Sequence, residues 1–385
     1  MSSSATGVVH SVDEIAGAWK EQRAERQARR HLDRVDFDAL RRTGLLAMPI
    51  PVEAGGLWEG AAISARSLCE CYRLLAGGDA SVALVSSMHP AVITFWLASP
   101  DRSQPEWERQ RSAVFASALA DEQWGTITSE PGSGGDIFRT RATAAALDGD
   151  SFLPGRAYAV SGDKHFGSGM GITDRMVTTA VADGDDAPSI FVLDVGGRAW
   201  DGSAGLRLTA EWDGMGMAAT QSHAMRLEGI PSVRMAWGGK IEQITRAAGP
   251  LVATLFTSVV LGVLDEAIGL ARDQIRNRAT ELRPFEQVEW ARAEQRHWLA
   301  VQAYEGALRA IESDESAALH AALRAKESVA ELAEQTLLRL TRVLGGGTFS
   351  RRSPFAHWFE DVRALGFLRP PWGLAYDQLF TTSLE

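Results

Sequence analysis

The sequence contains very little cysteine and has no pattern typical of a metal site. Cys69 and Cys71 are the two cysteines in 385 residues. Two positions apart on a helix they would face different directions, so we predict neither a disulfide nor a shared metal. The eight histidines are scattered, and no Cys-x-x-Cys or His-x-x-x-His spacing is present. We therefore expect no metal ion.

Positive charge is also in short supply. Lysine and arginine together number 39 against 49 aspartates and glutamates, which gives a formal net charge of -10. Proteins that bind nucleic acids or anionic membrane surfaces generally present basic surfaces. The balance therefore disfavours both partners and favours a small-molecule ligand.

The N-terminal 30 residues lack the basic-then-apolar order of a secretory signal, which favours a cytoplasmic protein. Residues 247–264 carry no charge over about the length of a membrane span. The charged stretch "DEAIGLARDQIRNR" continues their helical phase, and we find no second apolar run of this kind. We therefore predict the buried central helix of a bundle and not a membrane segment.

The sequence divides into three regions with different residue patterns. Helical periodicity dominates from about residue 12 to 100, with Asp79 as the expected N-cap of a helix, and returns from 237 to 344. Short strands separated by turns fill 113–235, with hairpin turns expected at Asp148-Gly149 and at Ser161-Gly162-Asp163. This order predicts an α+β fold with a helical domain at 1–112, a small barrel or sandwich at 113–236, and a helical domain at 237–385.

A glycine-rich loop, "TITSEPGSGGD" at 126–136, joins two expected strands. It lacks the lysine of a Walker loop, and it does not open a helix as a dinucleotide fingerprint does. Its glycines allow the backbone to approach a ligand closely, and Thr126, Thr128 and Ser129 can bind the polar edge of a flat ring such as a flavin. The alternative is an ordinary β-turn at the rim of a barrel.

Several motifs in order resemble the acyl-CoA dehydrogenase superfamily, from about residue 36 to 380. The segment "TSEPGSGGD" is similar to its Thr-Glu-Pro-x-x-Gly-Ser-Asp signature, and "YAVSGDKHFGSG", "EWDGMGMAATQSH" and "LGGGTFSRRSPFAHWFEDVRAL" resemble three later landmarks. The resemblance implies an N-terminal helical domain, a middle β-barrel and a C-terminal four-helix bundle that hold FAD or FMN. It places seven residues at the flavin: Thr126, Thr128, Ser129, Gly135, Phe166, Gly167 and Ser168.

Members of this superfamily assemble as dimers or tetramers whose subunits complete each other's flavin sites. The resemblance thus implies a homodimer or homotetramer, in which Arg278, Gly345 and Gly346 meet the neighbouring subunit's FAD. A planar guanidinium suits a pyrophosphate. Arg342 stands where the superfamily has a glutamine, and the Lys/Arg-x-x-Phe-Gly that normally follows the arginine is missing. These departures weaken FAD relative to FMN.

The carboxylate that dehydrogenases use to remove an α-proton is absent from both customary positions. Arg369 aligns at or near one, and the other, within 243–264, contains no acid. A general base contributes roughly 10²- to 10⁴-fold to the rate, so its loss is costly for dehydrogenation. "KHFGSG" and "WDGMGMAATQS" resemble the flavin-dependent monooxygenase branch represented by dibenzothiophene monooxygenase. That branch takes its reduced flavin from a flavin reductase, a possible partner here.

The resemblance suggests Ser129, Ser168 and His89 as catalytic candidates. The branch often has a C-terminal histidine where this chain reads 364–367 "ALGF", and His89 or Ser129 could replace it. A buried structural histidine is the alternative for His89. Trp124 and Arg369 are candidates for contact with the substrate, although many of the twelve tryptophans must lie in the core.

Two other functions stay open. The first is an acyl-thioester dehydrogenase that uses Asp121, Glu122 or Glu242 as its base. The second is a flavin-free relative kept for assembly. We expect Glu130 to hold its turn and Lys164 to pair with an acid.

Overall fold

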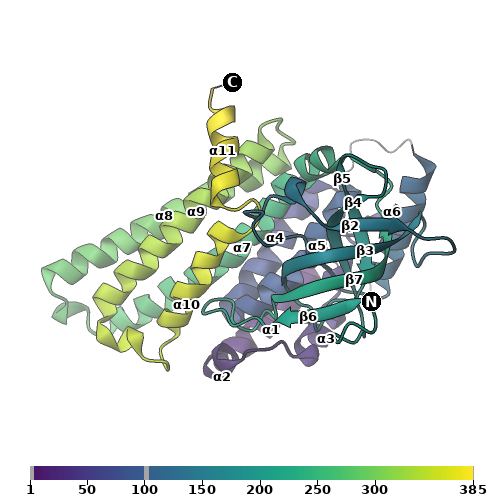
Figure 1. Cartoon of the computed structure of the whole chain (residues 1–385). Coiled ribbons are helices and arrows are strands. Elements are labelled where there is room, and N and C mark those ends of the chain that lie inside the picture. The colour runs from purple at the N-terminus through teal and green to yellow at the C-terminus, as the bar shows by residue number, and fades with distance from the viewer. Residues whose placement is uncertain (1–3, 99–103, 385) are drawn as a thin grey trace.

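The computed structural model describes residues 4–98 and 104–384, and Figure 1 shows three successive regions. The first region is helical. Its helices are α1 Ala5–Glu21, α2 Arg23–Ala28, α3 Arg34–Thr43, α4 Ala61–Gly78, α5 Ala80–Leu97 and α6 Pro105–Leu119. Asp79 separates α4 from α5, and its carboxylate accepts a hydrogen bond from the Val82 amide at 2.9 Å. The expected N-cap is therefore confirmed.

The middle region is a closed β-barrel. Its strands are β1 Trp124–Thr126, β2 Thr143–Ala146, β3 Ala157–Gly167, β4 Arg175–Ala182, β5 Pro188–Asp194, β6 Leu206–Ala210 and β7 His223–Arg234. The pairings run β4–β2–β3–β7–β5 and return to β4, which closes the ring, while β1 and β6 extend it alongside β4 and β7. The barrel predicted from the sequence is confirmed.

One of the two expected hairpin turns is wrong. The Asp148-Gly149 turn lies in the connection between the antiparallel strands β2 and β3, as predicted. The Ser161-Gly162-Asp163 segment instead lies inside β3, which pairs with β7 across a register shift at 160/161. Gly162 is needed there because a Cβ atom would stand 2.7 Å from the Cβ of Ala142. The glycine marks a bulge with close backbone packing and not a turn.

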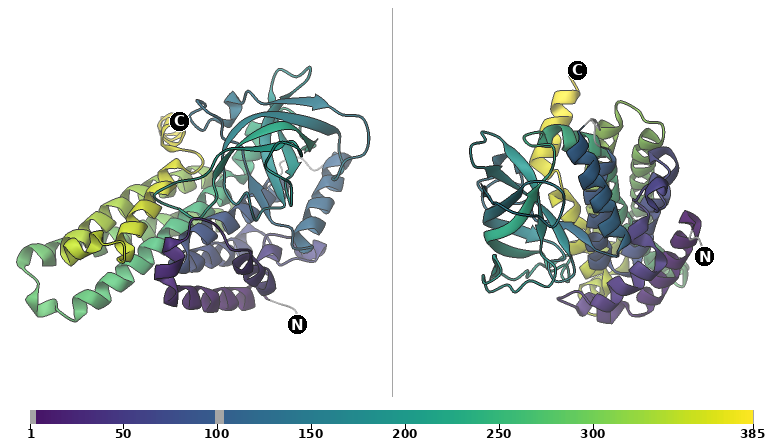
Figure 2. Two further views of the ribbon diagram at one scale, coloured as in Figure 1. Left: turned by 60° about the horizontal axis from the view of Figure 1, so that its bottom comes forward. Right: turned by 90° about the vertical axis from the view of Figure 1, so that its right-hand side faces the viewer.

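The last region is the helical bundle. It contains α7 Ile241–Arg276, α8 Pro284–Glu312, α9 Ala318–Leu344, α10 Pro354–Arg363 and α11 Trp372–Thr382. The first four helices pack together, and α4 and α5 cover α7 from the other side. Figure 2 shows the barrel on one side of the molecule and the N-terminal helices on the other. The predicted α+β architecture is confirmed.

Helices α5 and α7 are both long and apolar enough to span a membrane. Their most apolar windows are 89% and 78% buried within the fold, as core helices of a bundle are. The central helix predicted at 247–264 is thus confirmed as part of α7. Helix α5 is the second apolar run that the sequence analysis overlooked.

The predicted boundary between 112 and 113 falls inside α6, which continues to Leu119. Val114, Phe115 and Ala118 are buried at helical spacing, so this stretch belongs with the helices before it. The boundary between 236 and 237 lies between β7 and α7. The division into three domains otherwise stays a prediction.

Candidate active site

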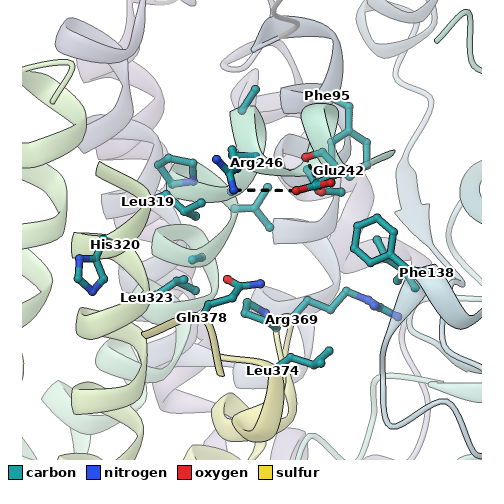
Figure 3. Close-up of a pocket in the computed structure, with 18 of the residues that line it drawn as sticks. Phe95, Phe138, Glu242, Arg246, Leu319, His320, Leu323, Arg369, Leu374 and Gln378 are labelled. Atoms are coloured by element: carbon teal, nitrogen blue, oxygen red, sulfur yellow. Dashed lines mark hydrogen bonds and ion pairs between the residues drawn. The ribbon is translucent and has the colours of Figure 1, made fainter. Parts of the chain in front are cut away.

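A cavity of about 1060 Å³ lies between the barrel and the bundle. Thr126, Thr128 and Gly135 of the glycine-rich loop form its barrel side, and Phe138 follows them. Helix α7, the start of α9 and helix α11 supply the opposite walls, as Figure 3 shows. A volume of this size suits a small or medium organic ligand.

The loop is held from behind by Glu130, whose side chain is buried. Its carboxylate accepts hydrogen bonds from the amides of Arg141 (2.7 Å) and Ala142 (3.2 Å) and pairs with Lys164 at 2.6 Å. Burial opposes the charge of Glu130, but the hydrogen bonds from Lys164 and Thr140 outweigh it and lower the pKa. Burial in turn lowers the pKa of Lys164 to about 8. Both residues have the structural role expected from the sequence.

Ser129 connects this loop to the end of β3. Its carbonyl accepts a hydrogen bond from the His165 amide at 2.8 Å. The next residue, Phe166, has a φ of +58° and is 56% exposed, and its ring meets Trp212 edge to face at 6.0 Å. An exposed aromatic ring on a strained backbone indicates a functional contact surface.

Ser168 lies at the base of this surface. The Ser168 hydroxyl lies 2.8 Å from the Ser222 hydroxyl, which in turn lies 2.7 Å from the Thr220 hydroxyl. Gly167 has no room for a side chain, because a Cβ atom would stand 2.8 Å from the Cδ1 of Ile127. The close backbone, the exposed ring of Phe166 and the nearby hydroxyls fit the flat, polar-edged ring of a flavin.

Arg369 joins this surface to the cavity. Its Nη1 donates to the Gly135 carbonyl at 2.7 Å, and its Nη2 donates to the Ser129 hydroxyl at 2.8 Å. Gly135 must be glycine, because its φ is +81° and a Cβ atom would stand 2.8 Å from Pro371. Burial lowers the pKa of Arg369 to about 10, so the guanidinium stays charged at neutral pH.

Lys326 of α9 anchors the segment that carries Arg369. It is fully buried, and its Nζ donates to the Pro370 carbonyl at 2.8 Å and pairs with Glu327 at 2.6 Å. Its ammonium also lies 6.0 Å from the centre of the Trp372 ring. This residue was not among those predicted from the sequence. Lysine at a core position of the helical repeat of α9 was the available signal.

The three alternative bases lie in different places. Glu242, on the first turn of α7, lines the cavity and is 3.9 Å from Arg246, with 76% of its side chain exposed. Asp121 is exposed outside the lining, and Glu122 pairs with Arg175 at 2.8 Å. Only Glu242 of the three therefore faces the cavity.

The geometry does not support a catalytic role for His89. The ring is fully buried outside the cavity lining, its Nε2 lies 3.1 Å from the Leu46 carbonyl, and its Nδ1 accepts from the Trp124 amide at 3.2 Å. Burial lowers the pKa of His89 to about 4, so the ring is neutral. Both nitrogens are occupied, which is the structural alternative weighed for this residue.

Trp124 also lies outside the cavity lining. Its ring is fully buried and packs edge to face on Trp96 at 5.7 Å, and its Nε1 donates to the Ser117 hydroxyl at 3.0 Å. The expected contact with substrate is therefore not supported. Trp124 closes the core between α5 and β1 instead.

The connection between α7 and α8, which carries Arg278, and the end of α9, which Gly345 follows, lie at the end of the bundle away from the barrel (Figure 1). Arg278 donates to the Val343 carbonyl at 2.7 Å, just before Gly345. Helix α7 has 36 residues, about 54 Å at 1.5 Å per residue, and separates them from the cavity of the same chain. Arg342 pairs with Glu289 at 3.2 Å. Any contact of these residues with a flavin requires a second subunit.

Two other expectations concern metals and thiols. Within residues 4–98 and 104–384, no group of three or more histidine, cysteine or acidic side chains is arranged to hold a metal ion. Cys69 and Cys71 are free thiols buried in the helical core. Burial raises the pKa of both thiols, that of Cys71 to about 12, which keeps both unreactive.

No protein-family model matches the sequence. A dibenzothiophene monooxygenase of Mycolicibacterium goodii is 25% identical over 283 residues, which is 70% of this chain and 63% of that protein. A probable FMNH2-dependent monooxygenase, SfnC of Pseudomonas putida, is 27% identical over 265 residues, 67% of this chain and 60% of that protein. Both matches span less than two thirds of those relatives.

A putative acyl-CoA dehydrogenase, YdbM of Bacillus subtilis (strain 168), is 24% identical over 392 residues, 94% of this chain and 92% of that protein. Among solved structures, FMN-bound TdsC from Paenibacillus sp. A11-2 has a TM-score of 0.80 at 20% identity and covers 97% of this chain and 96% of its own. Butyryl-CoA dehydrogenase from Megasphaera elsdenii has a TM-score of 0.80 at 16% identity, with 98% of each chain covered.

These structural likenesses establish the fold, and the sequence likenesses agree with the motifs described above. The chain therefore has the acyl-CoA dehydrogenase fold and resembles flavin-dependent oxidoreductases, with monooxygenases and a dehydrogenase both among its relatives.

Proposed function

We propose that this protein is a reduced-flavin monooxygenase that acts on a small or medium organic substrate. The observation that carries the proposal is Arg369, which lines the cavity beside Ser129 at or near the position where dehydrogenases place their base. A guanidinium of this pKa cannot take a proton from carbon at neutral pH. Oxygen transfer does not need that base.

The residues that would hold the flavin are Phe166 and Ser168 at the end of β3, with Ser129 and Thr128 of the glycine-rich loop. The free face of Phe166 can pack on a flat ring, and the hydroxyls can meet its polar edge. A bound reduced flavin would supply the electrons that activate molecular oxygen. The protein would orient the substrate in the adjoining cavity and exclude water from it.

FMN fits this chain better than FAD. Arg342, which replaces the superfamily's glutamine, is paired with Glu289. FMN needs no adenylate site, and TdsC, which shares this fold, binds FMN.

The charge of the cavity disfavours an acyl-CoA substrate. Its lining has two arginines, Arg246 and Arg369, and five carboxylates: Asp136, Glu242, Asp314, Glu315 and Asp377. Coenzyme A carries several phosphate charges, which these carboxylates would repel. The acidic lining therefore fits the proposed activity better than that of an acyl-CoA dehydrogenase.

The test uses the purified protein with FMN, a flavin reductase and reduced nicotinamide. We expect oxygen uptake that depends on an organic substrate, and incorporation of one ¹⁸O atom from labelled oxygen, measured by mass spectrometry. Substrate oxidation under anaerobic conditions with an artificial electron acceptor would contradict the proposal. A protein that binds neither FMN nor FAD would contradict it as well.

A dehydrogenase is the second candidate, because Glu242 lines the cavity. Its carboxylate is largely solvated and lies near Arg246, so its position resembles that of a surface ion pair. If it is the base, Glu242→Gln should abolish bleaching of bound flavin by an acyl thioester. Under our proposal, the same variant changes oxygen-dependent turnover by less than threefold.

Three further features belong to the proposal. We place the protein in the cytoplasm, with a flavin reductase as the source of reduced flavin. We also propose a homodimer or homotetramer, supported by the position of Arg278 and Gly346 at the far end of the bundle, where they could serve only a neighbouring subunit. Light scattering of the purified protein measures the assembly size.

A further inference from the structure

Arg369 is a partly buried cation that has no carboxylate partner within 4.0 Å among the described residues. Its two hydrogen bonds go to neutral acceptors, the Gly135 carbonyl and the Ser129 hydroxyl. The nearby Asp136 uses its Oδ1 to accept from the Phe138 amide at 2.9 Å. An unpaired charge that is partly removed from water is costly, and a negatively charged ligand would offset that cost.

The Asp136 carboxylate favours the charge of Arg369, but it makes no ion pair with the guanidinium within 4.0 Å among the described residues. Figure 3 shows Glu242 across the cavity, next to Arg246, with Arg369 on the opposite side. Asp377 belongs to α11 and Asp314 to the α8–α9 connection. Glu242, Asp314 and Asp377 therefore lie on other walls of the cavity. Asp136, which follows Gly135, is the carboxylate on the same wall as Arg369.

We propose that Arg369 binds a carboxylate of the substrate, so that the protein acts on organic acids carrying a single negative charge. This inference rests on the proposed function, because it names the substrate class of the same site. A carboxylate matches the planar edge of a guanidinium. Thr126 and Thr128 line the same side of the cavity and can donate to the second oxygen.

One negative charge fits this cavity better than several. A phosphate ester or coenzyme A would bring two or more charges near Asp136 and past the outer carboxylates. A monocarboxylate instead neutralises Arg369 and adds little repulsion elsewhere. The Lys326 contact to Pro370 keeps the arginine in place before the ligand arrives.

The experiment compares a carboxylate with the matched alcohol. The full-length protein, with and without FMN, is titrated by calorimetry at constant ionic strength with 2-naphthoate and 2-naphthylmethanol. Benzoate and benzyl alcohol form a smaller second pair. We expect the carboxylate of at least one pair to bind about 10- to 100-fold more tightly than its alcohol.

Arg369→Met should remove this preference, and Arg369→Gln serves the same purpose if the methionine variant does not fold. Arg369→Lys should restore part of it. The matched control is Arg246→Met, because Arg246 lines the same cavity but its side chain is 75% exposed. The control should keep the preference within threefold.

Equal binding of acid and alcohol by the unaltered protein overturns the inference, and so does a preference that survives Arg369→Met. If Arg369→Met weakens FMN binding tenfold and no carboxylate preference exists, the arginine serves the flavin and the inference is wrong. Failure of the unaltered protein to bind any flavin refutes the proposed function, whereas the carboxylate preference measured without FMN is judged separately.

Discussion

Two cations contact the glycine-rich loop, the buried Lys164 and the partly buried Arg369, and their surroundings differ. Lys164 has a carboxylate partner, Glu130, at 2.6 Å, and donates to the Thr179 carbonyl at 2.7 Å. Within the part of the chain that the structure describes, Arg369 donates only to a carbonyl and a hydroxyl. The fold supplies Lys164 with a carboxylate partner, whereas we infer that the partner of Arg369 is a bound ligand. The contrast separates a structural ion pair from a binding residue without any appeal to sequence similarity.

The largest effect on stability is expected from removing the carboxylate partner of Lys164. Glu130→Ala removes the counter-ion of Lys164 and the acceptor of two loop amides, so the free energy of unfolding should fall by about 3–5 kcal/mol. Arg369→Met removes a charge that lacks a carboxylate partner, and we expect a change within about 1 kcal/mol. Urea unfolding followed by circular dichroism measures both. Equal losses would show that the two sites are alike.

The pKa of His89 predicts how the free energy of unfolding changes with pH. Its pKa falls from the ordinary 6.5 to about 4 on folding, so the unfolded chain binds a proton that the folded chain does not between these values. Stability should therefore drop by about 3 kcal/mol as the pH falls from 6.5 to 4. In His89→Gln that part of the slope should disappear. An unchanged slope would show that the buried ring is not responsible.

Lys326 should have a smaller effect on stability. Lys326→Met leaves Glu327 buried, but burial already raises the pKa of Glu327, and this carboxyl can take up a proton. We expect a loss of about 1–2 kcal/mol of unfolding free energy. Because Pro370 loses its anchor, the carboxylate preference should weaken several-fold. A carboxylate preference that is unaltered in Lys326→Met would show that the segment carrying Arg369 keeps its position without this contact.

The smallest effect is expected at the far end of the bundle. If the flavin is FMN, Arg278→Met should leave FMN affinity unchanged within about twofold, because no adenylate or pyrophosphate reaches it. Fluorescence quenching of FMN measures this. A tenfold loss of affinity for FAD in the same variant, with FAD supporting turnover, would favour FAD instead.

Local sequence signals predicted the fold well. The Asp79 cap, the alternation of the strands and the uncharged core of α7 each depend on a few neighbouring residues. The turn predicted at 161–163 failed because Gly162 is required by Ala142, which lies in another segment. A close approach between distant segments and a turn can both require glycine, so the sequence alone could not distinguish them.

Residues of the candidate site were predicted from the sequence only where they belong to a recognisable motif. The loop around Ser129 and the Phe166–Ser168 segment were found, although their binding role stays a proposal. His89 and Trp124 were candidates by alignment, yet their position inside the core depends on α5 packing against β1. The absence of a counter-ion near Arg369 involves the loop, α7 and α11 together, so no sequence pattern could show it.

The contact between Gly135 and Pro371 couples two segments that are more than 230 residues apart. A side chain at 135, such as the serine of the dehydrogenase signature, would collide with the proline ring. A chain with serine at position 135 would have to move Pro371, and with it the nearby Arg369, before this segment could occupy its present place.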